Sequence, residues 1–97
     1  MDRIYFLNDE CFTWDENKAK SNKRKHGVTF EEACEVFFDP FRQGGEASSE
    51  NEYREFMLGF SLKRRLIFVV YVERGVFTRI ISARKATSHE KELYEET

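Results

Sequence analysis

Seven consecutive apolar residues, Leu66–Val72, leave no polar side chain to face water along this part of the chain. Most of them are β-branched or aromatic, which favours a strand over a helix. A strand without a polar face has to be covered on both sides, so the run predicts the central strand of a sheet. The remaining elements must therefore supply neighbouring strands or a layer that covers them.

The segments on either side of this run have the pattern of neighbouring strands. From Tyr53 to Leu62 the side chains alternate with the period of two that is typical of a half-buried strand. Another strand is predicted over Phe77–Ala83, after a short turn. Because connections this short join antiparallel neighbours, we expect a meander. One short strand is also expected within residues 41–46, and another before residue 15.

The first helix signal runs from Glu16 to His26. Asp15 precedes it as an N-cap whose carboxylate can accept from amides of the first turn, and Gly27 follows as a C-terminal cap. Ala19 is the only apolar residue of this helix, so little hydrophobic burial can hold it. Its lysines and arginine either face solvent or bind a partner, and the sequence favours solvent.

Two further helices are indicated by capping boxes, in which a Thr and the Glu three residues later satisfy each other's backbone amides. One begins at Thr29-x-x-Glu32 and ends before Pro40, and the other begins at Thr87-x-x-Glu90. The order of elements predicts an α+β domain with a mainly antiparallel sheet of about four to five strands. Two N-terminal helices and a C-terminal helix are expected against one face of that sheet.

The length of 97 residues favours a single domain that spans residues 1–97. No segment approaches the roughly 18 uncharged residues of a membrane span, and no long apolar run precedes Asn8. We therefore expect a cytoplasmic protein that does not bind a membrane. Cys11 and Cys34 belong to no recognisable ligand set, so neither a metal nor a cofactor is expected.

Charge is unevenly distributed along the chain, although the formal net charge is only −2. Residues 31–55 carry eight acidic and two basic groups, a net charge of −6, whereas residues 56–89 carry seven basic groups and one acidic group, a net charge of +6. Either the acidic segment simply faces solvent, or the molecule has a cationic face for an anionic ligand. Composition alone does not decide between these two interpretations.

Cations held beside a histidine suit the cleavage of RNA without a metal. That reaction needs a base for the 2′-hydroxyl, a group that stabilises charge at phosphorus, and an acid for the leaving 5′-oxygen. Histidine suits the first or third role because its ordinary pKa is about 6.5, and arginine suits the second because its guanidinium matches phosphate oxygens. His26 is a candidate, but a histidine beside Gly27 can instead interact with the last carbonyls of its helix.

Arg79 and Arg84 present a geometric difficulty. They are five residues apart, so a regular strand would place them on opposite faces of the sheet. Both can reach one site only if Arg84 lies beyond the end of the strand or if a β-bulge intervenes.

A series of ordered motifs resembles the BrnT family of bacterial type II toxins. With x for any residue, the motifs are Phe12-x-Trp14-Asp15-x-x-Lys18-Ala19-x-x-Asn22-x-x-Lys25-His26-Gly27-Val28-x-Phe30, Glu32-Ala33, Val36-Phe37-x-Asp39-Pro40, Glu73-Arg74 and Arg79-Ile80-Ile81-Ser82-Ala83-Arg84-Lys85-Ala86-Thr87, with Glu90 and Tyr94. The resemblance implies a RelE-like fold and a metal-independent endoribonuclease activity that arrests translation.

The resemblance also implies a partner. A BrnA-like antitoxin with a ribbon-helix-helix DNA-binding domain would neutralise the toxin, and operator DNA would be bound only through the complex of the two proteins. A function from a different class stays open, in which the chain is a catalytically weak protein-binding module that acts mainly as a co-repressor with its antitoxin.

The positions that match the family pattern define a candidate site. The active-site residues implied by the resemblance are Lys25, His26, Arg79 and Arg84. We expect His26 to act as general base or acid, the two arginines to stabilise transition-state charge, and Lys25 to bind phosphate. Further RNA contacts are expected from Lys23, Arg64, Arg74, Lys85 and Tyr94.

Overall fold

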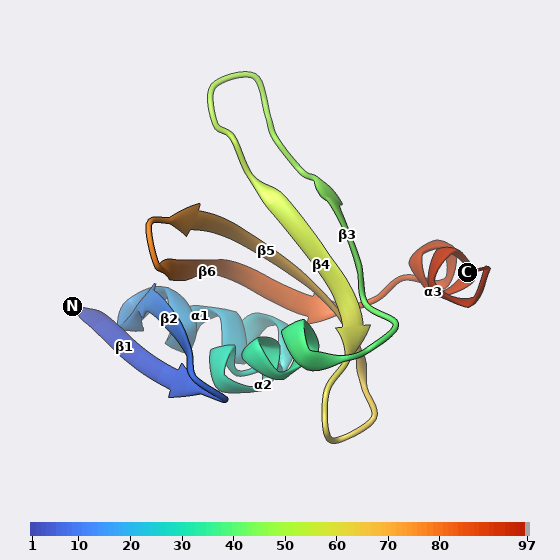
Figure 1. Ribbon diagram of the computed structural model, residues 1–97, viewed down its shortest axis with the longest axis horizontal. Coiled ribbons are helices and arrows are strands. Elements are labelled where there is room, and N and C mark those ends of the chain that lie inside the picture. The colour runs from blue at the N-terminus through green and yellow to red at the C-terminus, as the bar shows by residue number, and fades with distance from the viewer. Residues whose placement is uncertain (97) are drawn as a thin grey trace.

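The computed structural model describes residues 1–96, which form one six-stranded sheet with three α-helices (Figure 1). The elements in chain order are β1 (Asp2–Leu7), β2 (Glu10–Asp15), α1 (Glu16–His26), α2 (Phe30–Glu35), the 3-10 helix η1 (Val36–Phe38), β3 (Gln43–Glu46), β4 (Glu55–Phe60), β5 (Leu66–Arg74), β6 (Phe77–Lys85) and α3 (Ser88–Glu95). The strand order is β1-β2-β6-β5-β4-β3, and only β2 and β6 pair in parallel. Within these residues, no helix has the length and apolar character that a membrane crossing requires.

The α+β class and the mainly antiparallel sheet are confirmed, but the expected count of four to five strands is wrong. Residues 2–15 form a hairpin of two strands, β1 and β2, where a single short strand was expected. Asn8 and Asp9 connect them with φ angles of 49° and 67°. This left-handed geometry is that of a two-residue hairpin turn, and Asn and Asp adopt it more readily than most residues.

β5 lies inside the sheet between β4 and β6, as its apolar sequence predicts. Ile67, Val69 and Tyr71 face the layer that contains α1 and α2, and all three are buried. Trp14 of β2 joins this core and meets Phe30 of α2 edge to face, with ring centroids 5.8 Å apart. Full burial of a side chain of this size stabilises the fold by about 1.5–3 kcal/mol. Apolar burial therefore holds α2 in place, whereas α1 contributes only the partly buried Ala19 to this core.

α3 lies on the other face of the sheet, so the expectation that all helices cover one face is wrong. Phe60 of β4 meets Tyr94 of α3 edge to face, with ring centroids 5.2 Å apart. The neighbouring Gly59 approaches Val36 of η1, which directly follows α2. Successive residues of a strand point to opposite faces, so Phe60 and α3 lie on the face away from α1 and α2. No residue of α3 is buried, so this helix is attached to the sheet by few buried contacts.

The capping box predicted for α2 is only half formed. Thr29 accepts a hydrogen bond from the Glu32 amide at 3.0 Å, but the Glu32 carboxylate does not return to the Thr29 amide. It accepts instead from the Ser61 hydroxyl at 2.7 Å and from Nε of Arg65 at 2.8 Å. Hydrogen bonds from a charged donor are stronger than those from a neutral amide. The box predicted for α3 is complete.

Candidate active site

A β-bulge in β6 places Arg79 and Arg84 on the same face of the sheet. Arg79 pairs with Val72 of β5 and Arg84 pairs with Phe68, and a register shift between them leaves Ile81 without a partner. Val72 and Phe68 are four residues apart, so they and the two arginines face the same side. At about 3.3 Å per residue, the two positions are about 13 Å apart along the sheet. The bulge is thus one of the two conditions under which both arginines can serve one site.

Each arginine is bonded to a carboxylate. Arg79 donates from Nη2 to Asp2 of β1 at 3.0 Å. Arg84 donates from both terminal nitrogens to the two carboxylate oxygens of Glu90, at 2.8 and 2.9 Å, and lies 4.4 Å from the centre of the Phe68 ring. The hydrogen bonds between Arg84 and Glu90 raise the pKa of the guanidinium and lower the pKa of the carboxylate. Arg84 is therefore charged and held in a fixed orientation.

The end of α1 lies beside the bulge. Lys25 and His26 line a pocket of about 200 Å³ together with Ile81 and Ser82 of β6. Ser82 pairs with Val70 and therefore faces the same side of the sheet as Arg84, two residues further on. The structure thus brings Lys25 and His26 to the stretch of β6 that also carries Arg84.

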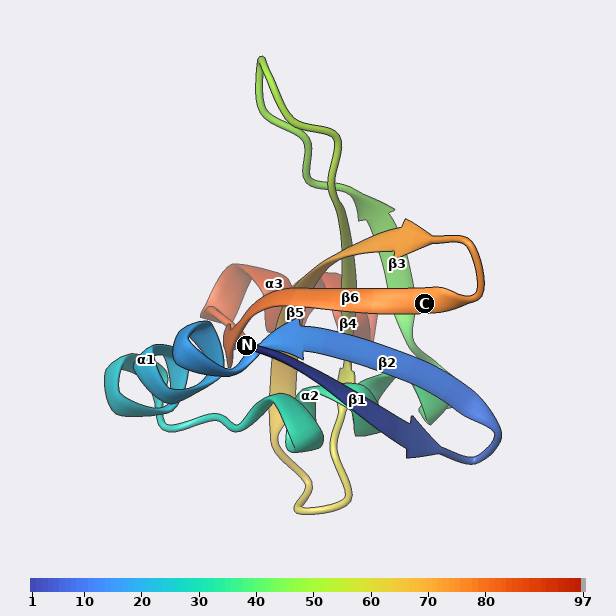
Figure 2. The ribbon, with the colours of Figure 1, turned by 90° about the vertical axis from the view of Figure 1, so that its left-hand side faces the viewer.

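α1 lies against this part of β6 (Figure 2), and Asn22 joins the two elements. β2 pairs with β6 only as far as Thr13 and Arg79, and α1 lies against the strand beyond that point. Asn22 is 7% exposed, and its side chain accepts from the Ala83 amide at 3.1 Å and donates to the Ala83 carbonyl at 2.8 Å. It also donates to the Val28 carbonyl at 3.0 Å. Nothing local in the sequence indicates this role, because Ala83 is 61 residues away.

Arg65 connects the β4–β5 hairpin to the residue that follows α1. Its Nη2 atom donates to the Gly27 carbonyl at 3.0 Å, while its Nε atom donates to Glu32. The hydrogen bonds that Glu32 accepts from Arg65 and Ser61 lower its pKa, against the opposite effect of burial. Arg65 was not among the predicted site residues, since the run Lys63-Arg64-Arg65 gives no local sign of which cation turns inward.

The other cations expected to contact RNA lie in separate places. Arg74 shares a pocket with Arg79 and Asp2 at the β1 side of the sheet. Arg64 and Lys85 line a pocket beside the β4–β5 hairpin, at the opposite end of β5 from Arg74. The predicted residues therefore lie in several separate places and do not form one compact cluster.

Tyr94 has a structural contact that the sequence did not indicate. Its hydroxyl donates to Oδ2 of Asp39 at 2.6 Å, and the same carboxylate atom accepts from the Phe60 amide at 2.8 Å. Burial and the hydrogen bond to Asp39 raise the pKa of Tyr94 to about 12. The phenol thus stays protonated at neutral pH and attaches α3 to the residue that follows η1.

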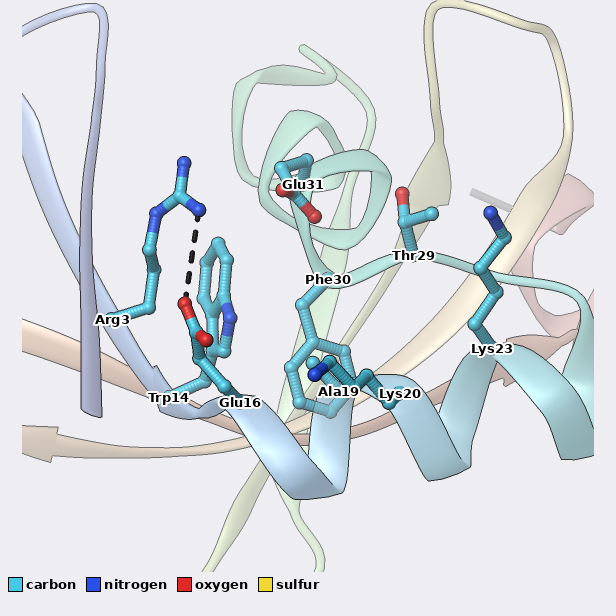
Figure 3. A pocket seen from close by; sticks show the side chains of 9 residues that line it. All are labelled: Arg3, Trp14, Glu16, Ala19, Lys20, Lys23, Thr29, Phe30 and Glu31. Carbon is cyan, nitrogen blue, oxygen red and sulfur yellow. Dashed lines mark ion pairs between the residues drawn. The ribbon is translucent and has the colours of Figure 1, made fainter. Parts of the chain in front are cut away.

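Lys23 lies away from the pocket beside the bulge. It lines a different pocket, of about 320 Å³, between the β1–β2 hairpin, α1 and the start of α2 (Figure 3). The same pocket contains Lys20, Glu31 and the ion pair between Arg3 and Glu16, with an N–O distance of 3.9 Å. Charges of both signs largely cancel at a distance, so this pocket offers little attraction for a polyanion.

Comparison with known proteins identifies the family to which this architecture belongs. A family model described as the ribonuclease toxin BrnT of type II toxin-antitoxin systems matches residues 14–90. The chain belongs to the BrnT family. Its structure is similar to the crystal structure of the Brucella abortus ribonuclease toxin BrnT, with 26% sequence identity and a TM-score of 0.59, over 77% of this chain and 94% of that one. A search of curated proteins found no match.

The BrnT family match contains every predicted site residue except Tyr94, which follows its last residue. It also contains Asn22 and Arg65, the two residues that attach α1 and Gly27 to the sheet and the hairpin. The family resemblance and the fold expected from it are therefore confirmed. Within residues 1–96, no group of three or more His, Cys, Asp or Glu side chains is placed to hold a metal ion.

Proposed function

We propose that this BrnT-family chain is a metal-independent endoribonuclease that arrests translation by cleaving RNA. The observation that supports the proposal best is the bulge at Ile81, which turns Arg79 and Arg84 to one face, beside the Lys25–His26 end of α1. Without the bulge the two arginines would face opposite sides of the sheet. Family membership supports the ribonuclease activity in general terms.

The proposed reaction is attack of the 2′-hydroxyl on the adjoining phosphorus. A base removes the 2′-hydroxyl proton, the bond from phosphorus to the 5′-oxygen breaks, and an acid protonates that oxygen. His26 takes one of these two roles. Arg84 lies on the same face of the sheet as Ser82, which lines the pocket that contains His26. It stabilises the charge at phosphorus, and Lys25 binds a phosphate oxygen. Arg79, about 13 Å further along the sheet, suits a neighbouring part of the RNA.

A BrnA-like antitoxin with a ribbon-helix-helix domain is the proposed partner, and the complex would bind operator DNA and repress its own operon. This part of the proposal rests on membership of a family of type II toxin-antitoxin systems. We further propose that the toxin acts in the cytoplasm, where its RNA substrate and the antitoxin are available.

The test of the activity is incubation of the purified chain with RNA, with and without EDTA. We expect cleavage in both conditions, with 5′-hydroxyl and 2′,3′-cyclic phosphate ends. Products with 3′-hydroxyl ends would reject attack by the 2′-hydroxyl, and loss of activity in EDTA would reject metal independence. Arg84→Ala and Arg79→Ala should each reduce cleavage, and the larger effect is expected for Arg84 because it is closer to His26.

One observation favours the alternative of a catalytically weak module that acts as a co-repressor. Both arginines are already bonded to carboxylates, Arg79 to Asp2 and Arg84 to Glu90, so neither is free for phosphate in this conformation. If the folded chain fails to cut RNA at stoichiometric concentration but still forms an operator-binding complex with its antitoxin, the alternative is correct.

A further inference from the structure

A pocket of about 390 Å³ lies beside the β4–β5 hairpin, near the point where α3 begins. The charged side chains that line it are all cations: Arg64, Arg65, Lys85 and Lys91. Arg65 is paired with Glu32. Within residues 1–96 the side chains of the other three form no ion pair or hydrogen bond, so the pocket has a positive charge that the protein itself leaves uncompensated.

An aromatic ring lies among these cations. Phe60 is 39% exposed and lines the pocket, although a ring of its size is usually buried. It is not loose, because Tyr94 packs against it edge to face at 5.2 Å and is itself bonded to Asp39. A fixed ring at the surface with cations around it is the arrangement by which proteins stack an unpaired base while holding its phosphates.

The backbone of Arg64 supports a role for its side chain. Its φ angle is 60°, in the left-handed region that glycine adopts without strain. The hairpin therefore holds an arginine where glycine would adopt the same backbone geometry without strain. Strained positions of this kind often occur at functional sites, and here the side chain lines the pocket that contains Phe60.

The pocket shares no lining residue with the pocket that contains His26, but two connections link it to the proposed active site. Arg65 lines the pocket and donates to the carbonyl of Gly27, the residue that follows His26. On the other side, Lys85 follows Arg84 directly along β6. A strand of RNA whose scissile phosphate lies between His26 and Arg84 would therefore meet this pocket within a short distance.

The geometry points to a subsite for single-stranded RNA, in which an unpaired base near the cleaved phosphate stacks on Phe60 while Arg64, Lys85 and Lys91 bind adjoining phosphates. The inference rests on the proposed function, since it takes the substrate to be RNA. Every base has a flat apolar face, so this subsite favours unpaired over paired RNA and is tolerant of sequence.

The test uses binding and not cleavage. Short 2′-O-methyl RNA strands lack the attacking hydroxyl, and 2-aminopurine placed at successive positions loses fluorescence when it stacks. We expect quenching at one or two adjacent positions. Phe60→Leu keeps an apolar side chain but should remove the quenching and weaken binding by about fivefold or more, whereas Phe60→Tyr should preserve both. The melting temperature of each variant shows whether it is folded.

Phe6→Leu is the matched control, because Phe6 is another exposed phenylalanine, 69% exposed, on the strand at the opposite edge of the sheet from β3. It should leave quenching and affinity unchanged. The cations are tested separately by Lys91→Gln, which removes one positive charge from the pocket. Because each phosphate that a protein neutralises on a single strand contributes about 0.7 to the slope of log affinity against log salt concentration, that slope should decrease by about 0.7.

Equal quenching by the native chain and Phe60→Leu would overturn the subsite, even if the chain cleaves RNA. Quenching that depends on Phe60 in a chain without nuclease activity would support the subsite while rejecting the proposed function. If a decaglutamate peptide binds in a Lys91-dependent manner while Phe60→Leu leaves RNA affinity unchanged, the pocket fits an acidic protein segment and the proposal is wrong.

Discussion

The side chain of Asn22 forms with the backbone of Ala83 the two hydrogen bonds that a neighbouring strand would otherwise form. Its side-chain amide accepts from the Ala83 N–H at 3.1 Å and donates to the Ala83 carbonyl at 2.8 Å. β2 has stopped pairing with β6 by this point, so the amide satisfies a stretch of strand edge that lies against α1. A helix with little apolar burial is thereby fixed at the position where it carries Lys25 and His26.

We expect Asn22→Ala to reduce the free energy of unfolding by about 1–3 kcal/mol, because it leaves the backbone groups of Ala83 buried without partners. Equilibrium denaturation with urea measures the change. The matched control is Asn17→Ala, the same substitution at an exposed position of the same helix, which should change stability by less than about 0.5 kcal/mol. Because alanine is a better helix former than asparagine, helix propensity cannot explain a loss of stability in either variant. A similar loss in both variants would contradict the role given to the contact with β6.

His26→Ala tests the proposed acid or base. His26 is exposed at the end of α1, so the folded state should be nearly unaffected. Removal of a general acid or base reduces the rate by about 10²–10⁴-fold, and growth arrest should be lost with it. His89→Ala is the control, since it removes the chain's only other histidine at an exposed position of α3. If His26→Ala cleaves RNA as well as the native chain does, another residue carries the proton.

Glu32→Gln tests the ion pair that holds the hairpin to α2. The Arg65 guanidinium lowers the pKa of Glu32 from its ordinary value of 4.5. The stabilisation is therefore complete above pH 4.5 and is lost as the pH falls through the lower pKa of the folded state. We expect the variant to be about 1–3 kcal/mol less stable at neutral pH, with a difference that shrinks in acid.

Unfolding free energies measured across this pH range check the Glu32 prediction. Glu31→Gln changes the adjacent carboxylate, which forms no ion pair within residues 1–96, and its difference from the native chain should vary little with pH. If the difference in unfolding free energy between Glu32→Gln and the native chain stays constant down to pH 3, the role given to the Arg65 ion pair is contradicted.

Arg64→Gly separates stability from RNA binding. Glycine relieves the left-handed strain at φ 60°, which costs other residues about 1–2 kcal/mol, so the variant should melt at the same or a higher temperature while its RNA affinity falls. Lys63→Gly is the control, because Lys63 has no positive φ and glycine there should destabilise the chain by roughly 0.5–1 kcal/mol. A variant at Arg64 that loses both stability and affinity would indicate a structural role for the side chain.

The parts of the fold that depend on neighbouring residues follow from the sequence. α1 begins after Asp15 and ends before Gly27 because the caps are local, and the Thr87–Glu90 box opens α3 for the same reason. The run at Leu66 likewise identifies the inner strand β5. In each case the residues that predict the helix end or the strand lie within that same helix turn or strand.

The parts that depend on distant residues do not follow from it. A bulge at Ile81 can be stated as a condition for Arg79 and Arg84 to share a face, but the strand alone does not show that the register of β5 requires it. Glu32 leaves its capping box for Arg65, 33 residues away. The candidate site depends on such contacts between residues that are distant in the sequence. The sequence therefore indicates which residues belong to the site but not how they are arranged.

The side-chain hydrogen bond at Ala83 gives this protein a reporter of one specific local opening. Most strand amides exchange with deuterium only when the sheet itself opens, but the Ala83 amide is bonded to a side chain of α1. Undocking of α1 alone therefore exposes it while the ladder between β5 and β6 remains formed. Exchange at this amide measures how often the helix that carries Lys25 and His26 leaves the proposed active site.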